Sequence, residues 1–399
     1  MLDSGMTCAR FDLTWGNLDF HRLSLRNLEA AVRRTKKICA VMIDTLGREV
    51  MVRREIKMDE KGWGRIEGTI EIKQGQQVVI STDPAAVIAD GFLPITYDKL
   101  HENVQRGDLL FLGRYLVSGA DVSSCFLEVK DIQGRNIVCV ANNSASLDGL
   151  ITVTHPERSP DTISNMQVDM PILAPQDIEN LRELSREFEI DFISLSYCRD
   201  AHDIRETRQA LKTIGINGVE IIAKVRMALQ GGLAPMRAAA EPSSPPASVQ
   251  LESRLALFNF RGILEEADGI MMSRGNIGLD VAAEKMAILQ KNIANMCTLV
   301  GKTLIITRVM DTMAVNPRPT RAEATDVANA VLDGVDAILL GSETLRGKFP
   351  IETVSMLAKI CRQAEKVGTP GSCSGIRLLV CMPKPSPLPC AAVRPPQPL

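Results

Sequence analysis

Between residues 165 and 366 the sequence alternates between short apolar runs and longer amphipathic stretches, and this alternation limits the possible folds more than any other feature. The apolar runs have the length of strands, and the amphipathic stretches have the period of helices. We expect strands at 191–196, 219–223, 269–272, 303–306 and 337–340, and helices at 178–188, 201–213, 283–297, 321–332 and 351–365. Strands that are apolar throughout are buried on both faces, which predicts a parallel sheet covered by helices. A run of consecutive strand–helix units favours a (β/α)₈ barrel, and an open doubly wound sheet remains the alternative.

The N-terminal part begins in the same way and then changes. A strand is expected at 6–13, a helix at 18–34 and a strand at 38–45. From 47 to 167 the apolar runs become short and alternating and are broken by Gly, Asp and Asn, which is typical of antiparallel β-structure. The pattern therefore predicts barrel residues at 1–46, a small antiparallel β-barrel domain inserted at 47–167, and the rest of the barrel at 168–366.

Two segments, 225–250 and 367–399, differ from the rest of the chain. Together they contain 12 of the 21 prolines, and neither has a period of 2 or 3.6. Both are predicted to be loop or disorder.

The composition excludes several classes of protein. The 399 residues are 45% hydrophobic and 24% charged, so the chain as a whole is not expected to be disordered. The net charge of −2 provides no basic surface for nucleic acid, and no apolar run approaches the ~20 residues that cross a membrane. The N-terminus also lacks the pattern of a signal peptide. Ten scattered cysteines and four histidines argue against a Cys/His metal site and for reduced cysteines in a cytoplasmic enzyme.

Charged and hydroxyl residues follow most of the expected strands, where active sites of parallel barrels lie. They are Arg10, Asp12, Thr14, Asp44, Thr45, Ser196, Arg199, Lys224, Arg274, Thr307, Arg308 and the segment 341–344. The arginines and lysine could bind an anionic substrate, and the acids could bind metal ions. This combination suits phosphoryl transfer from a phosphorylated carboxylic acid. Each residue alone could equally be a solvated loop residue. Lys224 follows an apolar strand, where it either has an anionic partner or extends to the rim.

Taken in order, these residues resemble the pyruvate kinase family. The matching segments are 5–16 (GMTCARFDLTWG), 39–47 (CAVMIDTLG), 191–199 (DFISLSYCR), 268–280 (DGIMMSRGNIGLD), 316–334 (NPRPTRAEATDVANAVLDG) and 337–353 (AILLGSETLRGKFPIET). The resemblance covers roughly 1–224 and 251–366. Trp15, Leu46 and Asn276 resemble the plant-type cytosolic branch.

The resemblance implies transfer of a phosphoryl group from phosphoenolpyruvate to ADP. It assigns binding of the transferring phosphoryl group to Arg10 and Lys224. It also assigns stabilisation of the enolate to Lys224. It assigns binding of the substrate carboxylate to Gly275, Asn276 and Thr307. Thr307 is also expected to belong to the relay that protonates the enolate carbon. The inserted domain becomes a lid that closes over ADP and excludes water.

The resemblance also implies Mg²⁺ or Mn²⁺, together with K⁺. The K⁺ site is assigned to Asp12, Thr14, Asp44 and the carbonyl of Thr45, and Glu49 corresponds to the glutamate that accompanies K⁺ dependence. Asn276 is one Mg²⁺ ligand. The other is expected two residues after Lys224, where this chain has Arg226.

Removing 225–250 gives Ala223-Lys224-Leu251-Glu252, which restores the motif, so we assign the second Mg²⁺ ligand to Glu252. The segment begins with Val, whose codons start with GT, and ends with Gln, one of whose codons is CAG. Both 225–250 and 367–399 are therefore hypothesised to be translated introns, the second replacing the C-terminal regulatory domain. Genomic DNA without GT…AG boundaries at these points would exclude this.

Other departures concern the barrel and ADP. The barrel is expected to lack its first strand, which would leave at most seven strands and two unpaired edges. Arg48 replaces a family proline and Met51 a nucleotide-binding arginine. The family is mostly tetrameric, and part of its contact surface comes from the absent domain.

The alternative function is a catalytically inactive truncated isoform or gene-model product that at most binds partner subunits. A different phosphoenolpyruvate- or pyruvate-handling barrel enzyme is a third interpretation.

Overall fold

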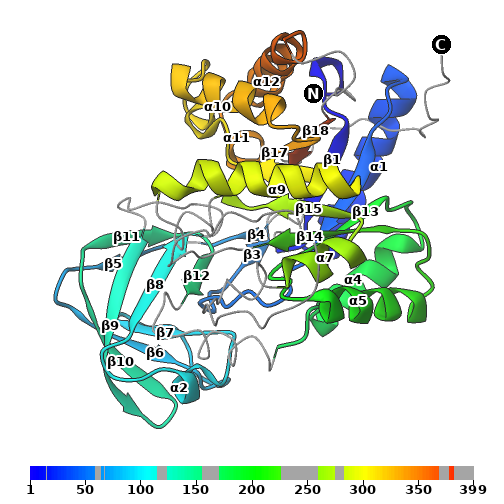
Figure 1. The fold of residues 1–399 in the computed structure, drawn as a ribbon. Coiled ribbons are helices and arrows are strands. Elements are labelled where there is room, and N and C mark those ends of the chain that lie inside the picture. The colour runs from blue at the N-terminus through cyan, green and yellow to red at the C-terminus, as the bar shows by residue number, and fades with distance from the viewer. Residues whose placement is uncertain are drawn as a thin grey trace, which may run out of the picture.

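The computed structural model describes residues 1–14, 16–58, 64–66, 68–114, 124–154, 170–225, 259–274, 283–367 and 377–381. They form a barrel with surrounding helices and, beside it, the inserted β domain, here called the lid (Figure 1). Trp15, the segment 226–258 and the segment 275–282 lie outside the described residues.

The barrel consists of eight strands that form a closed ring. They are β1 (Cys8–Asp12), β2 (Ala40–Asp44), β13 (Phe192–Leu195), β14 (Glu220–Val225), β15 (Gly269–Met272), β16 (Thr303–Thr307), β17 (Ala337–Leu340) and β18 (Arg377–Cys381). Every neighbouring pair is parallel. The predicted barrel is therefore confirmed, and the open sheet is excluded.

The eighth strand corrects two expectations. β18 pairs in parallel with β1 through Cys8 and Leu379, and with β17 through Leu339 and Leu379. The ring of described strands therefore has no free edges, and the loop predicted for 367–399 is wrong at 377–381. The physical reason is that two facing strand edges present unpaired N–H and C=O groups, which a short apolar segment satisfies by adding a strand. Prolines on either side hid this segment in the sequence.

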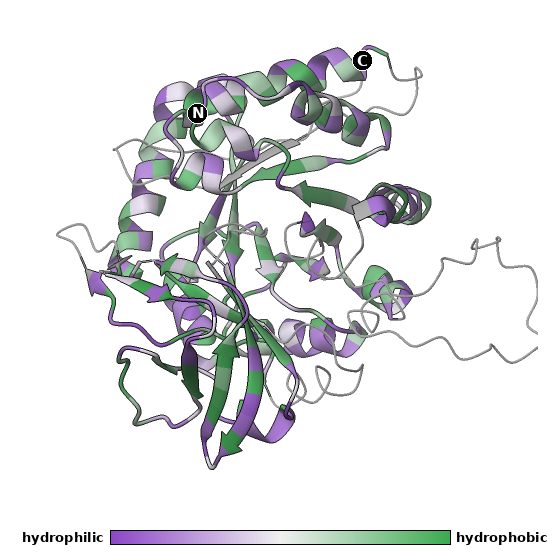
Figure 2. Ribbon diagram, turned by 90° about the vertical axis from the view of Figure 1, so that its left-hand side faces the viewer, coloured by the Kyte–Doolittle hydropathy of each residue, from purple (hydrophilic) through white to green (hydrophobic). Residues whose placement is uncertain are grey.

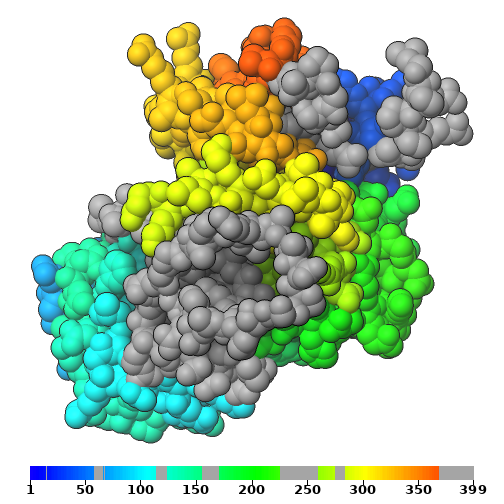
Figure 3. All heavy atoms as spheres, in the orientation of Figure 1, coloured from blue at the N-terminus to red at the C-terminus, as the bar shows by residue number. Residues whose placement is uncertain are grey.

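Helices cover the outside of the barrel in the predicted order. They are α1 (Leu18–Thr35), α4 (Pro175–Ser185), α5 (Ala201–Thr213), α7 (Phe260–Glu266), α9 (Met286–Val300), α10 (Arg321–Leu332) and α12 (Pro350–Glu365). Short turns η1 (Leu2–Ser4), η2 (Ala283–Lys285), η3 (Asp311–Ala314) and α11 (Ser342–Leu345) lie between them. Helix α9, yellow in Figure 3, forms a ridge on the face shown there. Helix α7 was not predicted. The capping box expected at Thr320 and Glu323 is present at the start of α10.

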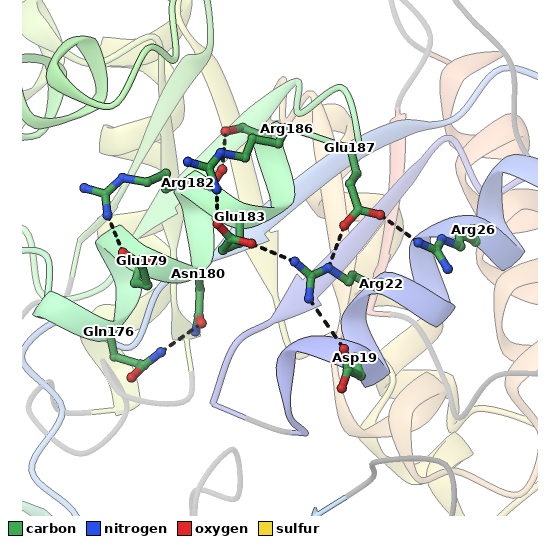
Figure 4. Close-up of polar contacts among 11 residues, drawn as sticks. Asp19, Arg22, Arg26, Gln176, Glu179, Asn180, Arg182, Glu183, Arg186 and Glu187 are labelled. Carbon is green, nitrogen blue, oxygen red and sulfur yellow. Dashed lines mark hydrogen bonds and ion pairs between the residues drawn. The ribbon is translucent and has the colours of Figure 1, made fainter.

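Helices α1 and α4 are neighbours although the lid separates them in the sequence. Arg22 bridges them by bonding Glu187 at 2.7 Å and Glu183 at 2.9 Å, and Arg26 bonds Glu187 at 2.8 Å (Figure 4). Exposed pairs of this kind contribute at most about 1 kcal/mol each. The apolar faces of the two helices, which include Leu28 and Leu181, pack into the barrel's core and contribute more.

The barrel strands alternate between two apolar layers. Cys8, Met42, Ile222, Met271, Ile305, Ala337 and Leu339 form one small cluster inside the ring. Their sequence neighbours, such as Ala9 and Ile221, belong to the larger cluster between strands and helices. Because side chains alternate along a strand, residues two positions after the inner cluster also face inwards.

The lid has its own sheet and core. Its elements are β3 (Lys57–Met58), β4 (Gly64–Arg65), β5 (Thr69–Ile72), β6 (Gln77–Ser81), β7 (Phe92–Pro94), α2 (Leu100–Asn103), β8 (Leu109–Arg114), β9 (Ser124–Gln133), β10 (Asn136–Ala141), β11 (Ala145–Asp148) and β12 (Ile151–Thr154). Six strands form one sheet in the order β12-β8-β9-β10-β6-β7, and β11–β5 and β3–β4 are separate pairs. All pairs are antiparallel except β6–β7. The described lid strands thus do not form the single closed ring of a β-barrel. Apolar and polar residues alternate along the lid strands (Figure 2).

Candidate active site

The inner face of the barrel changes from apolar to charged towards the C-terminal ends of the strands. Arg10 and Asp12 follow the inward Cys8 at two-residue steps, Asp44 follows Met42, and Lys224 follows Ile222. Strand alternation therefore brings residues from three strands to the same end of the ring. This placement could not follow from any one strand alone.

Asp44 is the centre of this charged group. Its carboxylate bonds Arg10 and accepts a hydrogen bond from Lys224 Nζ at 2.7 Å. Arg10 also donates to Asp12 at 3.1 Å. The side chains of Arg10 and Asp44 are only 3% and 1% exposed, whereas Lys224 is 16% exposed. Buried charges persist only when paired, so two cations and two carboxylates balance one another here.

Lys224 is also held from a second side. Its ammonium group donates to Ser196 Oγ at 3.1 Å, and Ser196 Oγ donates to the carbonyl of Thr45 at 2.8 Å. Thr45 in turn donates its hydroxyl to the carbonyl of Ser194 at 3.1 Å. This chain of bonds fixes the direction of the Lys224 side chain.

Electrostatics keep Asp12 ionised. Burial alone would raise the pKa of Asp12, but the charges of Arg10 and Lys224 and the hydrogen bonds of Thr14 outweigh it and lower that pKa. The Thr14 backbone N–H donates to Asp12 at 3.0 Å. Asp12 is thus a negative group on the inner face of the barrel.

The oxygens around Asp12 and Asp44 suit a hard cation. The carboxylates of Asp12 and Asp44, the hydroxyl of Thr14 and the carbonyl of Thr45 are the donor types that such ions prefer. Among the described residues there is no group of three or more His, Cys, Asp or Glu side chains that could hold a metal ion. Two carboxylates, a hydroxyl and a carbonyl are oxygen donors of mixed charge, a set that K⁺ would accept, and Asp44 would then exchange a bond to a cationic side chain.

Glu49 lies at the base of the lid and is bound by Tyr197, whose hydroxyl donates to Glu49 Oε1 at 3.1 Å. Tyr197 has a φ of 56°, a left-handed conformation that is costly for a tyrosine and that tends to occur at functional sites. Glu49 thus has a defined orientation.

Thr307 ends β16 on the same rim, and Arg274 fixes its backbone. Arg274 donates to the carbonyls of Thr307 at 3.0 Å and Arg308 at 2.6 Å, and it pairs with Asp326 of α10 at 2.5 Å. Arg308 is left-handed with a φ of 60°. The remaining assigned residues, Gly275, Asn276 and Glu252, lie outside the described residues.

Glu343 is a buried acid that the sequence analysis placed on the rim within the segment 341–344, without a role of its own. It follows β17 and is 1% exposed, and its Oε2 accepts the N–H of Gly341 at 2.8 Å. Burial, reinforced by the nearby charge of Asp311, raises the pKa of Glu343 to about 7. Within the described part of the chain, Glu343 Oε1 and Asp311 Oδ1 have no hydrogen-bond partner. Its position directly after an apolar strand was the available signal, the same one that singled out Lys224.

Replacing Glu343 by glutamine is expected to remove a pH dependence of stability. The folded-state pKa of about 7 lies above the ordinary 4.5, so wild-type stability falls as pH rises through this interval. The loss is at most about 3 kcal/mol, and glutamine should abolish it. Urea unfolding between pH 5 and 8 measures this, with the exposed Glu352→Gln on α12 as the control. Parallel pH profiles for wild type and Glu343→Gln would contradict the assignment.

The family model of the pyruvate kinase barrel domain matches residues 1–234 and 233–354. The chain belongs to the pyruvate kinase family. It is 40% identical over 367 residues to cytosolic pyruvate kinase 2 of Oryza sativa, and 32% identical over 371 residues to a pyruvate kinase of Dictyostelium discoideum. These alignments include 92% of this chain but only 62% and 63% of the relatives, so the chain spans less than two thirds of their length.

Solved pyruvate kinases share the fold. A crystal structure from Cryptosporidium parvum is 28% identical with a TM-score of 0.71, covering 91% of this chain and 66% of that one. Another from the same organism is 26% identical with a TM-score of 0.66, covering 92% and 65%. The resemblance stated from the motifs is thereby confirmed.

Two departures from the pyruvate kinase pattern are buried in the structure. Arg48 pairs with Asp203, and Met51 packs in an apolar cluster with Phe20, Leu150 and Leu345 that joins lid to barrel. In this arrangement neither side chain is available to a nucleotide. None of the helices in the described ranges is long and apolar enough to cross a membrane.

Proposed function

We propose that this chain carries the phosphoryl-transfer site of a pyruvate kinase, which converts phosphoenolpyruvate and ADP into pyruvate and ATP. The observation that carries the proposal is the buried group of Arg10, Asp44 and Lys224 at the C-terminal ends of the strands. Two cations meet there beside an apolar interior, where electrostatic interactions are strong. A phosphoryl group can replace the carboxylate as their partner.

In the proposed mechanism Arg10 and Lys224 bind the transferring phosphoryl group. Lys224 then stabilises the enolate oxygen left when the P–O bond breaks, because its ammonium group is already held beside Asp44 at this end of the barrel. Thr307 holds the substrate carboxylate and joins the relay that protonates the enolate carbon. The lid excludes water from the phosphoryl group, which would otherwise be hydrolysed.

The ions and remaining ligands follow the family pattern. Gly275 and Asn276 would contribute to the carboxylate site. Mg²⁺ or Mn²⁺ would be held by Glu252 and Asn276, and K⁺ by Asp12, Thr14, Asp44 and Thr45, with Glu49 nearby. When bound, these ions supply positive charge to the phosphoryl oxygens.

The wider assignments are proposals too. The lid corresponds to 47–167 and the barrel to 1–46 and 168–366, with β18 at 377–381 completing the ring. Relatives named cytosolic pyruvate kinase support a cytoplasmic location. A homotetramer would follow the family, with no nucleic acid or membrane partner.

One observation favours the second candidate, a catalytically inactive product. The family match breaks at 233–234, inside the segment 225–250, which separates Lys224 from Glu252. If Glu252 is displaced from the site, Mg²⁺ loses an anionic ligand and phosphoryl transfer fails.

The deciding experiment compares pyruvate formation by the full chain and by a chain that lacks 225–250. Each is assayed with phosphoenolpyruvate, ADP, Mg²⁺ and K⁺. We expect activity in the shortened chain, and activity lost on omission of K⁺. Activity in the shortened chain alone would support both the site and the intron hypothesis, whereas two folded but inactive chains would favour the inactive product. Sequencing the genomic DNA at the two segment boundaries tests the introns directly.

A further inference from the structure

We propose that Arg48 is a positioning residue that locks the two linkers between lid and barrel and orients Glu49 through Tyr197. The proposal concerns the base of the lid, and only its kinetic readout rests on the proposed function. Arg48 is one of the departures from the family pattern named above, and it is buried here rather than exposed.

The two linkers lie against each other where the chain leaves and re-enters the barrel. The outgoing linker follows Asp44 and enters the lid core at Val50, and the returning linker leads from Met170 to α4. Gly47 has a φ of 57°, and a Cβ atom there would lie 3.2 Å from the carbonyl of Ile172 on the other linker. The linkers therefore pack too closely for a side chain at Gly47.

Arg48, on the outgoing linker, bonds the returning linker and the barrel at once. Its Nη1 and Nη2 donate to the two carboxylate oxygens of Asp203 on α5 at 2.8 and 2.7 Å. Its Nε donates to the carbonyl of Met170 on the returning linker at 2.7 Å. A planar guanidinium with several fixed donors suits such bridging, whereas the point charge of lysine does not.

The pair is buried, which makes it a rigid connection. The side chains of Arg48 and Asp203 are 2% and 0% exposed. Burial would raise the pKa of Asp203, but the bonds and charge of Arg48, with Arg199, hold that pKa at about 2. Asp203 is thus ionised at neutral pH, and the loss of Arg48 would leave it with Arg199 as its cationic partner.

Arg48 also contacts the residue that orients Glu49. Its Nη1 donates to the carbonyl of Tyr197 at 3.2 Å, and the hydroxyl of Tyr197 donates to Glu49 at 3.1 Å. Tyr197 has the left-handed conformation noted above, which surrounding contacts must hold in place. Arg48 therefore acts on Glu49 without touching substrate or ion.

A separate anchor should allow Arg48 variants to fold. Asp177 of α4 accepts the N–H groups of Leu46 at 3.1 Å and Gly47 at 3.0 Å on the outgoing linker, and of Ala174 at 3.1 Å on the returning one. These are backbone bonds that do not involve the side chain at 48. Changing Arg48 should loosen the base of the lid rather than detach it.

The test compares Arg48→Met and Arg48→Lys with the control Arg53→Met. Arg53 lies on the same outgoing segment, but its bonds go to carbonyls of Asp83, Pro84 and Ile95 within the lid. Native-state hydrogen exchange of the amides at 46–50 and 172–174 is measured, with β15 as an internal reference. We expect exchange about tenfold faster or more in Arg48→Met, a smaller increase in Arg48→Lys, and no change in Arg53→Met or β15.

Kinetics provide the second readout, on a chain form that makes pyruvate. The KM for ADP and the K⁺ concentration for half-activation should rise about threefold or more in Arg48→Met, because the lid and Glu49 are less well placed. The KM for phosphoenolpyruvate should stay within about twofold, because its proposed cationic contacts lie inside the barrel. Unchanged linker exchange in folded Arg48→Met and Arg48→Lys would overturn the proposal. Faster exchange in a chain that makes no pyruvate would leave the lock standing and refute only the proposed function.

Discussion

Replacing Lys224 by methionine should reduce pyruvate formation by about three orders of magnitude or more. The substitution keeps most of the apolar stem and removes the ammonium group that bonds Asp44 at 2.7 Å and Ser196 at 3.1 Å. That group is the proposed partner of both the phosphoryl group and the enolate, so its loss affects charge that develops in the transition state. The measurement is kcat in the chain form that shows activity.

A lysine at the other end of the barrel provides the matched control. Lys302 precedes β16 and donates to the carbonyl of Ala267 at 2.7 Å, at the N-terminal ends of the strands. Lys302→Met should change stability slightly and leave kcat within about twofold. Asp44 keeps Arg10 as its partner in Lys224→Met, so the variant should fold. A folded Lys224→Met with more than a tenth of the wild-type kcat would refute the assigned role.

The substitution Leu379→Pro is expected to have the second large effect, a loss of stability. Residue 379 lies at the centre of β18 and is paired with Cys8 on one side and Leu339 on the other. Proline has no N–H and cannot join a ladder with neighbours on both sides. The free energy of unfolding should fall by about 3 kcal/mol or more, because the β1 and β17 edges lose their common partner. Urea unfolding and light scattering measure the two consequences.

Leu379→Ile is the control for this prediction. It keeps the backbone N–H and the preference for extended structure, so unfolding should change by less than about 1.5 kcal/mol. If Leu379→Pro had the same free energy of unfolding as Leu379→Ile, β18 would not contribute to barrel closure.

Most barrel elements could be predicted from the sequence because their signals are local. The strands at 269–272 and 337–340 and the helices at 201–213 and 321–332 have the predicted bounds. Apolar runs report burial on both faces, and a capping box reports a helix start. The strand at 377–381 was missed because its signal is short and surrounded by prolines. Its place depends on two edges that are far away in the sequence.

Part of the candidate site was also predictable from local sequence, and part depends on contacts between distant segments. The position of Lys224 after an apolar strand left two alternatives, an anionic partner or extension to the rim, and the structure supplies the partner Asp44. Motif resemblance indicated Arg10, Asp12 and Thr307 as well, but no pattern in the sequence connects Arg48 with Asp203, 155 positions later. In the sequence Arg48 is only a replacement of a family proline, whereas the structure buries it at the base of the lid.

The sequence by itself determined the barrel class, the inserted β domain and the rim residues, because strand alternation and strand ends depend on neighbours a few positions away. Only the tertiary structure decided which segment closes the ring, which carboxylate serves both Arg10 and Lys224, and how the lid is fastened. Each of these is a pairing between distant segments. Buried polar and charged groups must be paired, and a group becomes buried only when the chain folds. The distant hydrogen bonds and ion pairs that form are therefore decided by the tertiary structure.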